Sequence, residues 1–394
     1  MQTPHAEPNF TRAFEIVMEL MAISGKTGNE GEVAAYIKSK LLAAGYAEDQ
    51  LLVDDANQKA PTPSNTGNLV LTLPGNIDGA RRLLSAHMDT VPICVDSQPV
   101  LKGRTVHSAD PSTGLGADDR AGSAVLLNTA LEIIENKLPH PPLTFCWFIQ
   151  EETGMHGARL VNKEDLAHPE LAFNWDGGPA TKLSTGATGS YRIRAKIEGL
   201  ASHAGGAPEK GVSAIAIAAH AIADLDKNGW HGKVTKGSRE GTSNVGFIEG
   251  GEATNVVTDL VHVRAEARSH DPEFRKEMLN QIEKAFLKAA EAVANIDGAV
   301  GKVTFDNNLV YESFRLADDD PSLLEVEKVI RSLGLEPERS IANGGLDANW
   351  LTANGIPSVT MGCGQQDPHT VNETLNLDQF DNACRIGLCL ATQI

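Results

Sequence analysis

The spacing of hydrophobic residues predicts alternating helices and strands over the first half of the chain. Apolar residues recur at helical intervals over Asn9–Ile23 and Glu30–Gly45, and an apolar helix is expected over Ser123–Glu135. Short apolar runs bounded by turn residues are typical of buried strands. Such runs occupy Asn68–Leu73, Arg82–Ala86, Leu143–Ile149 and Leu171–Trp175. Strands that alternate with helices indicate a mostly parallel sheet.

A different pattern covers residues 188–310. Apolar and polar residues alternate there with a period of two, which is typical of antiparallel strands with one buried face. The expected strands are Ser190–Glu198, Thr242–Ile248, Val256–Ala267 and Lys302–Leu309, and the expected helices are Gly211–Asp226 and Pro272–Ala294. The order strand, helix, strand, strand, helix, strand resembles a ferredoxin-like unit on a four-stranded sheet.

The first pattern returns after Tyr311. A helix is expected over Ser322–Leu333, a strand around Ser358–Met361 and a final helix over Leu377–Leu390. The predicted fold class is α/β. One discontinuous domain, residues 1–187 and 311–394, contains a mixed, mostly parallel sheet, and a ferredoxin-like α+β domain, residues 188–310, is inserted into it. A chain of 394 residues is long enough to bury a core in each domain.

Composition excludes several classes of partner. The chain has 34 Lys and Arg against 52 Asp and Glu, a net charge of −18, which argues against nucleic acid or an anionic membrane surface as a partner. No apolar run reaches transmembrane length, and Met1–Phe10 lacks the pattern of a signal peptide. The five cysteines are scattered without a C-x-x-C pair. We therefore expect free thiols and a cytoplasmic protein.

Polar residues that can bind metals follow the ends of the predicted strands. His87 and Asp89 follow an apolar run, and side chains two apart in a strand point to the same face. The other candidates stand just past a strand or before a helix: Asp118, Glu151, Glu152, Asp176 and His369. In mostly parallel sheets, ligands gather outside the carboxyl ends of the strands. We therefore expect these side chains to meet at one edge of the sheet.

The two histidines and three of the carboxylates, Asp118, Glu152 and Asp176, form a donor set that suits divalent cations. Zn²⁺ is the leading choice, and Co²⁺ or Mn²⁺ are alternatives. Five ligands exceed what one tetrahedral ion needs, but they suit two ions about 3.5–4 Å apart that share a bridging carboxylate. Neighbours on an extended segment point opposite ways. Of the pair Glu151 and Glu152, one could therefore bind a metal while the other acts as general base toward a bridging water.

Five segments together resemble the di-zinc metallopeptidases related to peptidase T, carboxypeptidase G and aminoacylase. The segments are SAHMDTVP (85–92), GLGADDRAG (114–122), QEETG (150–154), NWDGG (174–178) and PHT (368–370). The resemblance spans essentially the whole chain. It implies a zinc-exopeptidase-type catalytic domain with an inserted lid and dimerisation domain, and therefore a homodimer.

The resemblance also implies roles for the metal-binding candidates. His87 would bind one metal ion and His369 the other, with Asp118 bridging them. Glu152 would complete one site and Asp176 the other. The peptide bond between Asp118 and Asp119 would be cis. Asp89 would orient His87, and Glu151 would take a proton from the bridging water and pass it to the leaving amine.

Further residues match the family outside the metal set. His203, in the segment SHAG (202–205), would reach the active site of a partner subunit and stabilise the oxyanion. Asn255 and Arg268 would bind the carbonyl and the carboxylate of the substrate. Gly344 and Gly345 belong to a G-G-x-D loop near the substrate. In peptidase T an Arg precedes this loop, whereas this chain has Asn at position 343.

The leading hypothesis is metal-dependent hydrolysis of amide bonds in short peptides, by an exopeptidase acting on dipeptides or tripeptides. An N-acyl amino acid deacylase is the alternative within the enzyme class, since both reactions need only an amide next to a terminal carboxylate. A non-catalytic, metal-stabilised binding protein is the alternative outside it. Glu151 argues against that last reading, because a structural metal site has no use for a free base.

Overall fold

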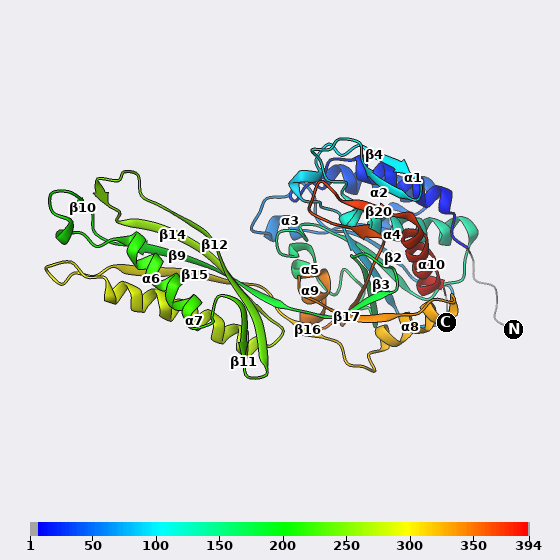
Figure 1. Cartoon of the computed structure of the whole chain (residues 1–394). Helices are drawn as coiled ribbons and strands as arrows, with labels where there is room; N and C mark the ends of the chain where they lie inside the picture. Colours follow the sequence, from blue (N-terminus) through cyan, green and yellow to red (C-terminus); the bar gives the residue numbers. More distant parts are fainter. Residues whose placement is uncertain (1–6, 393–394) are drawn as a thin grey trace. The chain divides into compact units, whose positions relative to one another are not determined.

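The computed structural model describes residues 7–392, which form two compact units (Figure 1). Among these residues, unit 1 comprises 7–187 and 315–392, and unit 2 comprises Thr188–Phe314. Within residues 7–392, no helix combines the length and the hydrophobicity needed to cross a membrane.

Unit 1 is built on a mixed sheet whose centre is parallel. The strand order is β1-β2-β6-β3-β7-β18-β8-β16, with β17 beside β8. The strands are β1 (Leu51–Val53), β2 (Leu69–Leu73), β3 (Arg82–His87), β6 (Leu143–Phe148), β7 (Leu171–Trp175), β8 (Lys182–Ala187), β16 (Phe314–Arg315), β17 (Glu338–Ala342) and β18 (Val359–Met361). The neighbours β6, β3, β7 and β18 are parallel, while β2 and β8 flank them in the antiparallel sense. The predicted fold class is confirmed.

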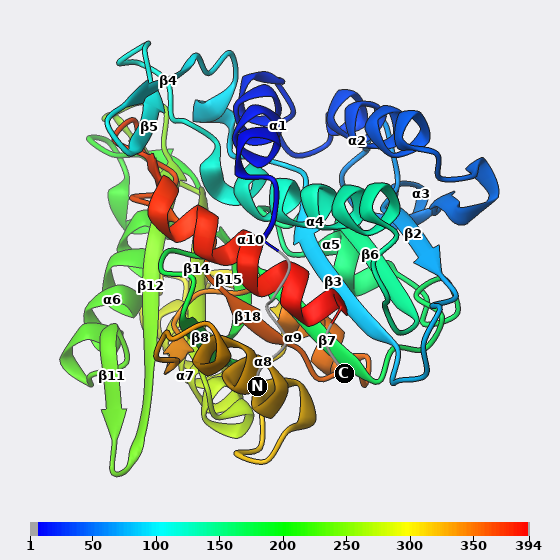
Figure 2. The same cartoon turned by 90° about the vertical axis from the view of Figure 1, so that its right-hand side faces the viewer.

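Helices cover both faces of this sheet. One face carries α1 (Phe10–Ala22), α2 (Gly31–Ala44), α4 (Ala117–Asn136), α8 (Pro321–Ser332) and α10 (Leu377–Thr392). Figure 2 shows α4 and α10 running across it. The indole Nε1 of Trp147 in β6 donates to the Ser123 carbonyl of α4 at 3.2 Å. The other face packs Cys146 and Phe148 against α5 (His156–Leu160) and α9 (Asp347–Ala353), with α3 (Ala56–Lys59) beside α5.

A second, small sheet in unit 1 was not expected from the sequence. It joins β4 (Pro99–Lys102), β5 (Thr105–Ser108), β19 (Gln365–Gln366) and β20 (Thr374–Asn376) in the order β19-β20-β5-β4. Strands of two to four residues are too short to show an apolar period. Pairing of β20 with β5 ties the segment after His369 to the segment that leads to Asp118.

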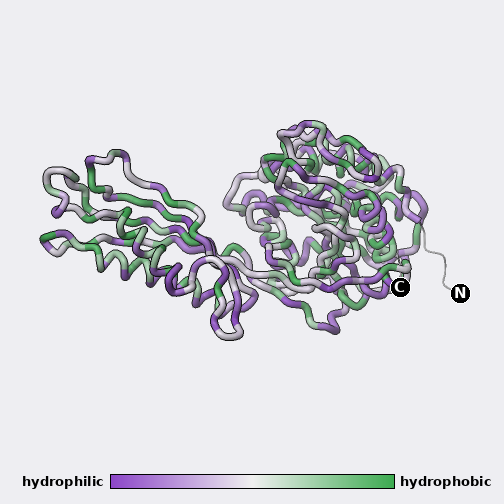
Figure 3. Tube along the Cα trace, in the orientation of Figure 1, coloured by the Kyte–Doolittle hydropathy of each residue, from purple (hydrophilic) through white to green (hydrophobic). Residues whose placement is uncertain are grey.

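Unit 2 is an antiparallel sheet in the order β11-β12-β14-β9-β15. Its elements are β9 (Gly189–Glu198), β11 (Gly232–Lys236), β12 (Arg239–Gly250), β14 (Leu260–Ser269), β15 (Lys302–Tyr311), α6 (Ala214–Lys227) and α7 (Pro272–Ala292). The two helices pack together and share one apolar core with the sheet. Hydrophobic and hydrophilic positions alternate along them, as expected of helices with one buried face (Figure 3).

Two predictions for unit 2 were wrong in detail. The sheet has five strands instead of four, because β11 pairs with β12. Only Val234 of β11 is buried, so the strand leaves no apolar period in the sequence. The single strand expected over Val256–Ala267 is divided into β13 (Val256–Val257) and β14, and β13 pairs instead with β10 (Ser202–His203).

Candidate metal centre

The parallel centre of the unit 1 sheet delivers the predicted metal ligands to one edge. His87 is the last residue of β3, and Asp176 directly follows β7. Glu151 and Glu152 follow β6, and His369 lies between β19 and β20, in the segment that follows β18. Because these four strands are parallel neighbours, their carboxyl ends lie side by side.

Asp118, in a non-helical stretch at the start of α4, lies between the two histidines. Its Oδ1 is 3.2 Å from His87 Nε2, and its Oδ2 is 3.2 Å from His369 Nε2. His369 Nε2 is also 2.9 Å from Glu152 Oε2. Ligand atoms of His87, Asp118 and Glu152 all lie within 4.8 Å of one another. Each oxygen of Asp118 therefore faces a different imidazole, which is the arrangement of a carboxylate that can bridge two cations.

A cavity of about 290 Å³ opens over these groups. Its lining includes Asp118, Glu151, Glu152, Asp176, His369 and Gly345. His87 lies beneath it, with 1% of its surface exposed. The cavity is thus bounded by acidic and imidazole side chains on the side of the strand ends.

The carboxyl groups buried at this cavity outnumber the positively charged groups beside them. Burial raises the pKa of Glu152 and of Asp176 to about 7, and it raises the pKa of Glu151 well above its ordinary value. Hydrogen bonds to Asp118 and Glu152 raise the pKa of His369 to about 10. Buried carboxylates are stable only when they are paired, protonated or bound to metal. The donor set therefore fits divalent cations.

Asp89 holds both His87 and the turn that carries the two glutamates. His87 Nδ1 is 3.0 Å from the Asp89 carbonyl oxygen and 3.4 Å from its Oδ1. The Asp89 carboxylate accepts from the N–H of Glu151 at 2.9 Å, from the N–H of Glu152 at 3.3 Å and from the Thr27 hydroxyl at 2.6 Å. A donor bond from Nδ1 leaves Nε2 free for a metal ion.

The expected geometry of the Glu151 and Glu152 pair was wrong. The segment is a tight turn and not an extended strand, since the Glu151 carbonyl accepts from the N–H groups of Gly154 at 2.9 Å and Met155 at 2.8 Å. Within this turn Glu152 reaches His369, and Glu151 lines the cavity with 8% of its surface exposed. Tertiary contacts, not alternation along a strand, separate the two carboxylates.

Glu373 is a residue of this site that sequence reasoning missed. Its Oε1 accepts from the N–H of Asp118 at 2.9 Å, and its Oε2 accepts from the N–H of Gly116 at 2.7 Å and of Leu115 at 3.0 Å. Glu373 is 1% exposed and lies four residues after His369. It therefore fastens the loop that carries Asp118 to the loop that carries His369. No local pattern in the sequence predicts such a buried hydrogen-bond acceptor.

The residues next to the predicted ligands have supporting contacts. Asp119 accepts from the N–H of His87 at 3.2 Å and of Gly122 at 3.0 Å, and the Asp118–Asp119 peptide bond is cis, as the resemblance implies. The Cys363 thiol is buried 3.4 Å from Asp119 Oδ1, and burial raises its pKa well above the ordinary value. A thiol that stays protonated is a poor nucleophile.

The predicted residues of unit 2 fall into two groups. His203 and Asn255 lie together at the β10–β13 ribbon, where the Ala204 N–H donates to the Asn255 carbonyl at 2.9 Å. Arg268 lies near the far end of β14, eight residues after Leu260, which corresponds to about 26 Å along a strand. In unit 1, Gly345 lines the cavity and Gly344 is exposed.

Comparisons with known proteins agree with this centre. The uncharacterized protein YqjE of Bacillus subtilis (strain 168) is 31% identical over 373 residues, 94% of this chain and 95% of the relative. A tripeptidase from Staphylococcus aureus subsp. aureus Mu50 superposes with a TM-score of 0.88 at 32% identity, covering 98% of this chain and 99% of the other. The aminopeptidase PepT from Bacillus cereus ATCC 10987 superposes with a TM-score of 0.84 at 30% identity, covering 98% of both chains.

A family model also matches most of the chain. The model described as "Peptidase family M20/M25/M40" matches residues 83–393, a span that includes every predicted metal ligand from His87 to His369. This match and the cluster of His87, Asp118 and Glu152 both indicate a metal centre at the ends of the strands. The chain therefore belongs to peptidase family M20/M25/M40 and is a metal-dependent hydrolase of peptide bonds.

Proposed function

We propose that the chain is an exopeptidase of dipeptides and tripeptides that uses two divalent metal ions, with Zn²⁺ as the leading choice. The observation that carries the proposal is Asp118, whose two oxygens each lie 3.2 Å from the Nε2 of a different histidine. The tripeptidase of Staphylococcus aureus and the aminopeptidase of Bacillus cereus, both similar over 98% of this chain, support short peptides as substrates.

In this proposal Asp118 would be a ligand of both ions. The 2.9 Å distance from His369 Nε2 to Glu152 Oε2 supports one ion shared by these two residues, which leaves His87 and Asp176 for the other. When bound, the ions would polarise the scissile carbonyl and lower the pKa of the attacking water. Asp89 keeps His87 in the tautomer whose Nε2 is free.

Glu151 is the proposed general base. It lines the cavity, and burial raises its pKa well above the ordinary value of a glutamate, which makes it a stronger proton acceptor than an exposed carboxylate. Its carboxylate takes the proton of the attacking water and passes it to the nitrogen of the leaving amine. Its backbone N–H is held by Asp89 at 2.9 Å, so the turn that presents the base is fixed.

His203 is the proposed donor to the oxyanion in the site of a partner subunit. Its Nδ1 accepts from the N–H groups of Gly205 at 3.1 Å and Gly206 at 2.9 Å. The ring proton of the neutral form therefore lies on Nε2, which is free to donate. A homodimer through unit 2 belongs to this proposal, and the exposed side chains of Leu200, Ile215 and Val256 offer apolar surface for it.

Substrate recognition in this proposal involves Asn255 for the carbonyl, Arg268 for the terminal carboxylate, and the Gly344 and Gly345 loop. Asn343 brings an amide in place of a guanidinium, and an amide cannot form a bidentate ion pair. Recognition of the carboxylate therefore depends on Arg268. We also place the protein in the cytoplasm, since all five cysteines are buried free thiols.

The function is tested by assaying metal-loaded protein on peptides of varied length, with each terminus blocked in turn. We expect hydrolysis of free dipeptides and tripeptides, and a loss of about 10³-fold in kcat for Glu151→Gln with unchanged metal content. If the protein cleaves only N-acyl amino acids, it is a deacylase and not an exopeptidase. No hydrolysis of any substrate at full metal loading would favour a binding protein.

A further inference from the structure

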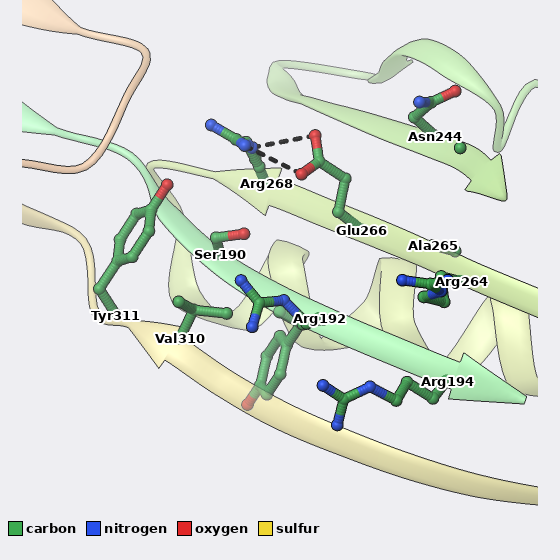
Figure 4. A pocket seen from close by; sticks show the side chains of 12 residues that line it. Ser190, Arg192, Arg194, Asn244, Arg264, Ala265, Glu266, Arg268, Val310 and Tyr311 are labelled. Carbon is green, nitrogen blue, oxygen red and sulfur yellow. Dashed lines mark hydrogen bonds and ion pairs between the residues drawn. The ribbon is translucent and has the colours of Figure 1, made fainter. Parts of the chain in front are cut away.

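Unit 2 carries a cavity of about 450 Å³ on the face of its sheet opposite α6 and α7. Four arginines line this cavity, Arg192 and Arg194 from β9 and Arg264 and Arg268 from β14. Figure 4 shows their side chains on the same side of the two strands. We call this feature the arginine cavity.

The strand register sets like charges against each other. Arg194 is directly opposite Arg264 on the neighbouring antiparallel strand, and Arg192 is opposite Glu266. Like charges directly opposite each other destabilise a sheet. Four arginines gathered in one cavity are also unexpected in a chain of net charge −18. A local arrangement that costs stability is typical of a functional site.

The carboxylates nearby neutralise only two of the four arginines in the arginine cavity. Glu266 is held by Arg268 through two hydrogen bonds, at 3.1 Å to Nε and 2.9 Å to Nη2 (Figure 4). Arg192 thus has no ion pair within residues 7–392, although Glu266 lies opposite it in the sheet. Arg194 is paired with Asp306 at 3.0 Å.

Arg264 likewise lacks a carboxylate in the described part of the chain. Its guanidinium lies over the Phe247 ring, 3.7 Å from the ring centroid. Arg192 and Arg264 are both exposed at the cavity. Two guanidinium groups are therefore available, and a guanidinium matches a carboxylate in a bidentate fork.

We propose that the arginine cavity binds a small organic anion with two or more carboxylates, with Arg192 and Arg264 as the principal contacts. An acidic peptide and a free polycarboxylate share this chemistry. If the anion is a peptide substrate, the inference rests on the proposed exopeptidase function. If it is a free polycarboxylate, it does not.

Calorimetric titration of the metal-loaded full chain tests the proposal. The Glu151→Gln variant keeps peptides intact, so binding is measured apart from turnover. The probes are Glu-Glu-Glu, Ala-Ala-Ala and citrate. We expect the double variant Arg192→Ala, Arg264→Ala to bind at least one acidic probe about tenfold more weakly, with binding of Ala-Ala-Ala unchanged.

Lys233→Ala is the matched control, because Lys233 is a 73% exposed cation of unit 2 outside the cavity. It should change the affinity for acidic probes less than twofold, by about the uncertainty of the measurement. Loss of Glu-Glu-Glu binding alone identifies a peptide, and loss of citrate binding identifies a free polycarboxylate. Equal affinities in the double variant and the control overturn the proposal.

Folding of the double variant is checked by thermal unfolding. Removal of Arg264 relieves its repulsion with Arg194, so the melting temperature should not fall. Arg192→Lys should keep part of the affinity, since the charge remains while the fork is lost. Variant-sensitive binding of acidic probes by a protein that hydrolyses no peptide would overturn the exopeptidase and leave the anion site standing.

Discussion

The two units treat charge in opposite ways. Unit 1 has 19 Lys and Arg against 35 Asp and Glu, whereas unit 2 has 15 against 17. In unit 1 the important carboxylates are buried at the ends of parallel strands. In unit 2 the arginines stand on an exposed face of an antiparallel sheet. A buried anionic site favours a bound cation, while an exposed cationic face can bind an anion from solution.

The units also differ in how firmly their functional groups are held. Asp89 and Glu373 anchor the turns of unit 1 that carry candidate metal ligands, through hydrogen bonds to backbone N–H groups. Arg192 and Arg264 in unit 2 have no comparable anchor within residues 7–392. Substitutions in unit 1 should therefore change metal binding, and substitutions in unit 2 should change substrate handling with the metal in place.

Asp118→Ala should have the largest effect. Loss of the carboxylate that faces both histidines removes a ligand from each metal site, so the variant should retain fewer than two ions and lose all measurable activity. Elemental analysis after gel filtration measures metal content, and circular dichroism confirms the fold. A variant that keeps two tightly bound ions would show that Asp118 does not bridge them.

His203→Ala, in unit 2, should leave the metal content at the wild-type level. Loss of an oxyanion donor typically lowers kcat about 10²–10³-fold with little change in KM. Steady-state kinetics with elemental analysis measures both. His231→Ala is the control, since His231 belongs to unit 2 but not to the β10–β13 ribbon. Equal kinetics in the two variants would remove His203 from the catalytic machinery.

Glu373→Gln should weaken metal binding by about 10–100-fold, which is the range for residues that position metal ligands. An amide presents only one acceptor oxygen to the three N–H groups that Glu373 now holds. Hydrogen exchange at Leu115, Gly116 and Asp118 should become faster, which reports the loosened loop independently of activity. Asp378→Asn, an exposed carboxylate paired with Arg104, is the control and should change neither.

The smallest effect concerns pH. The pKa of Glu152 and of Asp176 is about 7 in the folded, metal-free protein and about 4 in an unfolded chain. Between these values the folded state holds protons that the unfolded state has lost, so stability falls as pH rises. The raised pKa of His369, about 10, has the same sign at higher pH.

Calorimetry should therefore show the melting temperature of metal-free protein falling by about 5 °C from pH 5 to pH 8. Metal-loaded protein should not show this fall, because bound cations replace the protons. We expect Asp306→Asn to show the same dependence of melting temperature on pH as the wild type, since that carboxylate is exposed in unit 2. A melting temperature of metal-free protein that rises with pH would contradict the assignment.

Local pattern in the sequence was enough to predict the α/β class and to place the candidate metal ligands at the strand ends. His87 ends a buried strand, and Glu152 and Asp176 follow one within a few residues, so an apolar run and the polar residue at its end form one readable signal. The family resemblance added Asp118 as the bridging residue and the cis peptide bond, and the structure contains that bond.

Contacts between distant segments were decided only by the tertiary structure. Glu373 and Asp118 are 255 residues apart, and a buried acceptor of backbone hydrogen bonds leaves no periodic trace in the sequence. The sequence shows Arg194 and Arg264 as two separate arginines, and only the register of β9 against β14 sets them opposite each other. Periodicity reports which face a side chain takes, whereas its partner across the fold depends on the path of the whole chain.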